Sequence, residues 1–126
     1  MFVNFSMPIE RKLAAIMFTD IADYSDIKAK DEEEALFLLQ EKRKVLKPII
    51  KQHDGVYVNS PSDGTLAYFD SAYQASTCAT LFQESIFNDD SLNVRVGIHV
   101  GDIVNDKGDI YGDGVNVASR LENMAP

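Results

Sequence analysis

Two aspartates at the ends of apolar segments are the first candidates for chemistry. Asp20 follows an apolar run over residues 12–19, and Asp63 lies in the turn sequence of residues 60–64. Neighbouring carboxylates repel each other unless a proton or a cation neutralises them. A divalent cation bound by carboxylate oxygens and by phosphate oxygens is typical of a magnesium–nucleotide site. Two such metals could hold the attacking and leaving oxygens of a phosphoryl displacement. The simpler alternative makes Asp20 a helix cap and Asp63 an ordinary turn residue.

The elements that must position these aspartates follow from the apolar pattern. A helix is expected over residues 31–53, with Asp31 as its cap, Leu36 in its apolar stripe and Gly55 at its end. Residues 21–29 are ambiguous and could form a short helix. The other expected elements are strands at residues 12–19, 56–59, 65–69 and 94–100, a strand starting at 103–104, a loop at 109–114, and helices at 71–87 and 115–124.

The order strand–helix–strand–strand–helix–strand matches the ferredoxin-like arrangement, an α+β fold of the palm type with helices on one face of an antiparallel sheet. We expect an N-terminal arm at residues 1–10 and one domain over residues 11–126. In this topology the first strand lies between the third and the fourth. The exit of the first strand and the hairpin between the second and third strands then share one edge, which would bring Asp20 and Asp63 together.

Composition excludes several classes of partner. The chain has 126 residues, of which 45% are hydrophobic and 25% are charged, as expected of a single folded domain. Its net charge of −8 argues against nucleic acid or an anionic membrane as the main partner. No apolar run approaches the roughly 20 residues of a membrane span. The single cysteine, Cys78, excludes an intrachain disulfide and a cysteine-built zinc site, and it favours a reducing, cytoplasmic location.

Four segments also carry a family resemblance: residues 18–21 with 24–25, 62–64, 96–101 and 109–122. The last is the longest and most specific, and reads Asp-Ile-Tyr-Gly-Asp-Gly-Val-Asn-Val-Ala-Ser-Arg-Leu-Glu. In this order the segments resemble the catalytic domain of class III nucleotidyl (adenylate/guanylate) cyclases, from about Arg11 to the last residue. The resemblance implies an adenylate cyclase in cyclic-nucleotide signalling, which converts ATP to 3′,5′-cyclic AMP and pyrophosphate with two Mg²⁺ or Mn²⁺ ions.

The resemblance implies roles for residues near the first strand. Asp20 and Asp63 would bind the metals, and Ile21 would add a backbone carbonyl. The triphosphate would be approached by the backbone amides of Ala22, Asp23, Tyr24 and Ser25.

The resemblance assigns the base, the ribose and the reacting phosphate to later residues. Asp109 would accept a hydrogen bond from the adenine amino group, Asn116 would position the ribose, and Arg120 would stabilise charge on the transferred phosphate. Asn116 and Arg120 are four residues apart, so on a helix they face the same way. In the family these residues and the metal carboxylates of one site come from different chains. The resemblance therefore implies a head-to-tail homodimer with two composite sites.

The sequence departs from the family pattern at four places, one of which is Ser62 in place of a glycine in the turn before Asp63. Asn59 stands where a lysine usually helps to read adenine, and Asp23 stands where a glycine is usual. The chain also ends at Pro126, before the C-terminal strands that the family carries. We therefore expect weak or no turnover from the 126-residue chain. Two alternatives remain open: a catalytically weak or inactive nucleotide-binding regulatory module, and a guanylate cyclase.

Overall fold

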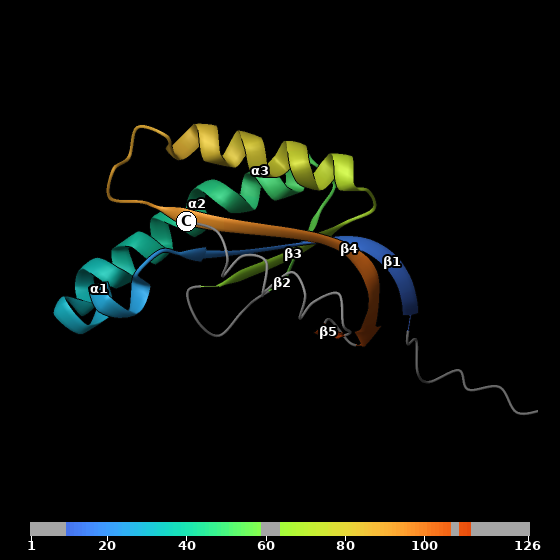
Figure 1. Ribbon diagram of the computed structural model, residues 1–126, viewed down its shortest axis with the longest axis horizontal. Coiled ribbons are helices and arrows are strands. Elements are labelled where there is room, and N and C mark those ends of the chain that lie inside the picture. The colour runs from blue at the N-terminus through green and yellow to red at the C-terminus, as the bar shows by residue number, and fades with distance from the viewer. Residues whose placement is uncertain (1–9, 59–63, 107–108, 112–126) are drawn as a thin grey trace, which may run out of the picture.

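The computed structural model describes residues 10–58, 64–106 and 109–111. The helices and strands follow one another in the order β1-α1-α2-β2-β3-α3-β4-β5, and Figure 1 shows their arrangement. Their bounds are β1 Glu10–Ile21, α1 Tyr24–Lys30, α2 Glu32–Gln52, β2 Val56–Val58, β3 Thr65–Phe69, α3 Ala72–Ile86, β4 Val94–Asp106 and β5 Asp109–Tyr111.

The sheet has the strand order β2-β3-β1-β4-β5, and every neighbouring pair is antiparallel. The first strand thus lies between β3 and β4, which confirms the predicted ferredoxin-like order. Strands β1 and β4 pair along the whole of β1, from Glu10 opposite Asn105 to Ile21 opposite Val94. The two long helices, α2 and α3, lie on one side of the sheet, called the helix side below (Figure 1).

Alternation along β1 divides its side chains between the two sides of the sheet. Ala15, Met17 and Ile21 pack into the main core with α2 and α3 on the helix side. Ala14 and Ile16 belong to a smaller buried cluster on the opposite side. Thr19 therefore belongs to the helix side, whereas the side chain of Asp20 projects from the opposite side.

The long helices begin as the sequence predicts. The Asp31 carboxylate accepts hydrogen bonds from the amides of Glu33 and Glu34 at the start of α2. Ser71 and Gln74 form a reciprocal capping box at the start of α3. Cys78 is buried in the core, as predicted, and burial raises the pKa of its thiol to about 11.

Three local expectations are wrong. The break expected between residues 100 and 103 is absent, because β4 continues through Gly101 in register with β1. The start of the expected loop at residues 109–114 is strand β5, which pairs with the end of β4. Leu36 is 53% exposed rather than part of the core stripe, because it lies on the outer side of α2.

Gly55, expected to end the helix, has a different role after α2. The left-handed residue after the helix is Asp54, with φ 58°, and not Gly55. Gly55 donates its amide to the Ile50 carbonyl at 2.9 Å. A Cβ at this position would lie 2.9 Å from Cγ2 of Ile50 and against the Phe69 ring. The glycine is therefore needed for close packing rather than for its backbone freedom.

Candidate active site

Asp20 lies one residue before the end of β1 and forms a bidentate ion pair with Arg95. The two residues are direct cross-strand partners in the β1–β4 ladder. Nε and Nη2 of Arg95 donate to the two carboxylate oxygens at 3.0 and 2.9 Å. The Asp20 side chain is 15% exposed and that of Arg95 is 25% exposed. The carboxylate is thus held in a fixed orientation by a charge-assisted pair.

The chain turns sharply after Asp20 to enter α1. The Ala22 amide donates to the Asn93 carbonyl at 2.8 Å, which ties this turn to the residue before β4. Asp23 has φ 59° and ψ 24°, the left-handed conformation that glycine adopts most easily and that aspartate tolerates. The turn therefore keeps the geometry of a glycine position with a carboxylate added.

The end of β1 and the turn enclose a hollow of about 290 Å³. Its lining is mostly polar, and consists of Asp20, Ile21, Asp23, Tyr24, Ser25, Asp26 and Arg95. Five of these are predicted site residues, so the structure brings together the predicted set around Asp20. Ala22 is not among the lining residues, and its amide donates to the Asn93 carbonyl. Carboxylate and hydroxyl oxygens beside a guanidinium suit a hard divalent cation with a phosphate ligand.

The remaining predicted residues are outside the described part of the chain. This holds for Asn59, Asp63, Asn116 and Arg120, and for the side chain of Asp109, whose backbone begins β5. The pairing of β1 with β3 nevertheless places the first residue of β3, because Thr65 lies opposite Thr19. The strand that follows Asp63 thus starts beside the residue that precedes Asp20. Within the described ranges, no three His, Cys, Asp or Glu side chains converge to hold a metal ion.

The prediction from sequence missed Arg95. The residue lies in an alternating strand pattern, Val94-Arg95-Val96, in which both valines pack into the helix-side core. Alternation alone puts Arg95 on the side opposite the helices, which was a usable signal. Its position opposite Asp20 depends on the β1–β4 register, and the sequence pattern does not define that register.

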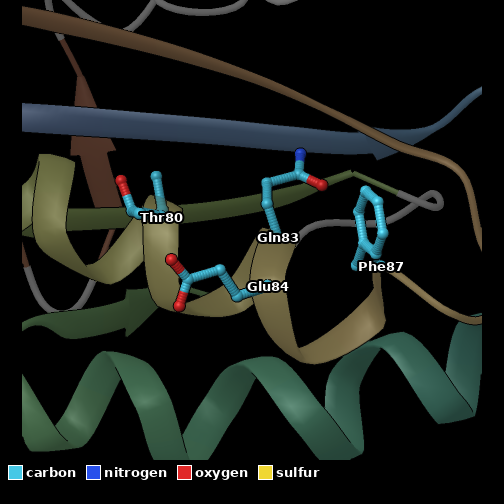
Figure 2. A pocket seen from close by; sticks show the side chains of 5 residues that line it. Thr80, Gln83, Glu84 and Phe87 are labelled. Carbon is cyan, nitrogen blue, oxygen red and sulfur yellow. The ribbon is translucent and has the colours of Figure 1, made fainter.

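A larger hollow of about 480 Å³ lies on α3, outside the set of residues predicted for the site. It is lined by Ala79, Thr80, Gln83, Glu84 and Phe87 (Figure 2). The lining is mainly apolar, and Phe87 is 81% exposed. The amide of Gln83 donates to the Val94 carbonyl at 2.9 Å and is used for packing α3 against β4. This hollow lacks the paired charges of the one beside Asp20, so size alone does not identify the site.

The fold and the polar hollow define an α+β domain with a ferredoxin-like sheet and an oxygen-rich end to its first strand. Residues 9–126 match the sequence model described as the adenylate and guanylate cyclase catalytic domain. The chain belongs to this family. The resemblance identified from the sequence motifs is therefore confirmed.

Individual relatives agree with this assignment. The chain is 37% identical over 125 residues to "Putative adenylate cyclase 3" of Rhizobium meliloti (strain 1021), covering 93% of this chain and 21% of the relative. It is 32% identical over 120 residues to an adenylate cyclase of Streptomyces coelicolor, covering 94% of this chain and 31% of the relative. The fold matches the crystal structure of an adenylate/guanylate cyclase/hydrolase from Silicibacter pomeroyi with a TM-score of 0.85, at 37% identity, over 94% of this chain and 73% of that one.

The chain thus spans about a fifth to a third of the length of these two curated relatives. Among the helices that the structure describes, none has both the length and the apolar composition needed to cross a membrane.

Proposed function

We propose that this chain is an adenylate cyclase domain, which converts ATP to 3′,5′-cyclic AMP and pyrophosphate. The observation that supports this most is Asp20, fixed at the end of β1 in a polar hollow beside Arg95, in a chain of the cyclase family. The choice of ATP is supported by relatives that carry the name adenylate cyclase. A cytoplasmic, reducing location remains part of the proposal.

The residues around Asp20 fit a Mg²⁺ or Mn²⁺ site, because their side chains offer hard oxygen donors in a partly buried hollow. Asp20 and Asp63, with the carbonyl of Ile21, would hold the metals. Bound metal would supply charge neutralisation for the triphosphate and activation of the attacking 3′-hydroxyl. The turn from Ala22 to Ser25 would border the triphosphate through the backbone amides that lie beyond Ala22.

Arg95 adds a residue that the sequence prediction did not include. Its guanidinium occupies the Asp20 carboxylate, which a cation would also need. The guanidinium lines the same hollow and has the planar donors that phosphate oxygens accept. We therefore assign Arg95 a second role as a phosphate partner once a metal neutralises Asp20.

The residues for base, ribose and phosphate transfer would come from a second copy of the chain. Asp109 would bind the adenine amino group, Asn116 the ribose and Arg120 the transferred phosphate, across a head-to-tail homodimer. Such composite sites form only in the dimer, so specific activity would rise with protein concentration.

The test is product formation from ATP and from GTP in the presence of Mn²⁺, followed by chromatographic identification of the cyclic nucleotide. We expect a low level of cyclic AMP from the native chain, loss of that product in Asp20→Asn, and an unchanged level in Asp70→Asn. Asp70 is a matched control, because it is a carboxylate paired with Lys12 and is 79% exposed. Cyclic AMP formation that persists in Asp20→Asn would contradict the role of Asp20.

The same assay separates the alternatives. Cyclic GMP as the main product would indicate a guanylate cyclase, an outcome that the replacement of the usual lysine by Asn59 makes worth testing. Calorimetry with a non-hydrolysable ATP analogue covers the remaining case. Tight binding without turnover would indicate a nucleotide-binding regulatory module.

A further inference from the structure

A lysine is buried inside the helix-side core. Lys42 lies in the middle of α2 and is 0% exposed. Its Nζ donates a hydrogen bond to the backbone carbonyl of Thr19 at 3.2 Å. The other buried residues of α2 are all apolar: Ala35, Leu38, Leu39, Leu46, Ile49 and Ile50. A fully buried ammonium is unfavourable unless polar groups around it compensate, so an apolar residue would satisfy packing alone at this position.

The surroundings of Lys42 at the sheet are polar as well. Thr19 and Thr65 are direct partners across β1 and β3, and both are fully buried. Neither hydroxyl has a hydrogen-bond partner within the described ranges. A pair of buried threonines and a buried lysine therefore form a small polar region in an otherwise apolar core.

The polar region is adjacent in sequence to the two aspartates that we propose as metal ligands. Thr19 directly precedes Asp20 on β1, and Thr65 follows Asp63 by two residues. Since side chains alternate along a strand, Lys42 holds β1 from the helix side while Asp20 projects from the opposite side. The hydrogen bond to the Thr19 carbonyl thus fixes the peptide unit that carries Asp20.

We propose that Lys42 is a positioning residue for the metal site, which fixes β1 at Thr19 so that the Asp20 carboxylate is presented beside the start of β3. This inference rests on the proposed function, because it assigns Lys42 a role toward the Asp20 metal site. It adds to that function a residue that does not touch metal or nucleotide.

The sign of the effect on metal affinity distinguishes positioning from simple electrostatics. A buried positive charge close to a cation site repels the cation, so removal of the charge alone would tighten metal binding. Loss of positioning has the opposite effect, because the carboxylate is no longer held in place. A purely structural lysine would change thermal stability and leave metal affinity unchanged at temperatures well below unfolding.

The experiment measures Mn²⁺ binding by electron paramagnetic resonance in the native chain and in Lys42→Met, Lys42→Arg and Lys44→Met. Lys44 is an exposed lysine on the same helix, so its variant removes the same charge without touching β1. We expect Lys42→Met to weaken Mn²⁺ binding about tenfold, the equivalent of about 1.4 kcal/mol. Lys42→Arg should restore most of the affinity, and Lys44→Met should bind as the native chain does. Unfolding curves identify variants that fold, and Lys42→Gln replaces Lys42→Met if the latter does not.

The outcomes separate the two proposals. A native chain that binds Mn²⁺ with folded Lys42 variants of equal or higher affinity would overturn the positioning role and leave the metal site intact. A native chain that binds no Mn²⁺ would overturn the metal site, and the role of Lys42 with it. Weaker binding in Lys42→Met, rescued by arginine, would establish the role.

Discussion

The ion pair between Asp20 and Arg95 predicts that replacing Arg95 changes the affinity for metal and the affinity for nucleotide in opposite directions. In the structure, the guanidinium of Arg95 contacts both carboxylate oxygens of Asp20, at 3.0 and 2.9 Å. A cation that binds Asp20 must displace it. Arg95→Met removes this competitor while keeping an unbranched side chain about as long as the aliphatic part of arginine. We therefore expect the variant to bind Mn²⁺ alone more tightly than the native chain.

The size of the effect follows from the geometry of the pair. Two unit charges about 4 Å apart, at an effective dielectric constant of about 20, attract by about 4 kcal/mol. Both side chains remain partly exposed, at 15% and 25%, and solvent screening reduces the net value, which we take as about 2 kcal/mol. Loss of that competition should tighten Mn²⁺ binding about 30-fold. With ATP present, the same variant lacks a phosphate partner and should bind the Mn²⁺–ATP complex about tenfold more weakly.

Electron paramagnetic resonance of Mn²⁺, with and without a non-hydrolysable ATP analogue, measures both quantities. Lys12→Met is the matched control, because it breaks the exposed Lys12–Asp70 ion pair on the same sheet and should alter neither affinity. Unchanged or weaker Mn²⁺ binding in nucleotide-free Arg95→Met would refute the competition between guanidinium and metal.

Three further predictions concern stability, measured by urea unfolding. Asp31→Ala removes an acceptor that caps two amides of α2 and should lower the free energy of unfolding by about 1 kcal/mol; no change would contradict the cap. Gly55→Ala places a methyl group against the Phe69 ring and should lower it by about 1–3 kcal/mol, whereas a neutral result would show that the ring can move away. Burial raises the pKa of Cys78 from 9.0 to about 11, so the unfolded thiol ionises first and stability falls as pH rises from 9 through 11. The native chain should lose up to about 3 kcal/mol more than Cys78→Ala over that interval, and parallel pH profiles would contradict the assignment.

Much of the fold was predictable because its signals are local. The Asp31 cap and a long apolar stripe predict helix α2. Strand β3 is predicted at the same residues at which it is observed. The errors fall where pairing overrides local pattern. Gly101 suggests a break, yet β4 continues through it because twelve consecutive residues of β1 provide partners. Residues 109–111 read as a loop, yet they pair with the end of β4.

The candidate site was predictable only in part. Asp20 could be identified from its place at the end of an apolar run, and the residues of the following turn lie beside it in the hollow. Arg95 depends on a partner 75 residues away in the sequence, so it required the register. Lys42 had a signal, because it follows Leu38 and precedes Leu46 by four residues and so falls on the buried face of α2. Which carbonyl its ammonium reaches depends on how the helix packs over the sheet.

Because β1 and β4 pair without a break, the orientation of Asp20 depends on the number of residues that precede it in β1. Removing one residue between Glu10 and Thr19 could leave a hydrogen-bonded sheet of nearly normal length, but every later side chain of β1 would change sides. The Asp20 carboxylate would then point into the apolar core, and Ile21 would take its place opposite Arg95. Such a deletion removes only one residue, yet we expect it to abolish the proposed activity. Loops at the ends of the helices face no such constraint, so changes in length are far better tolerated there.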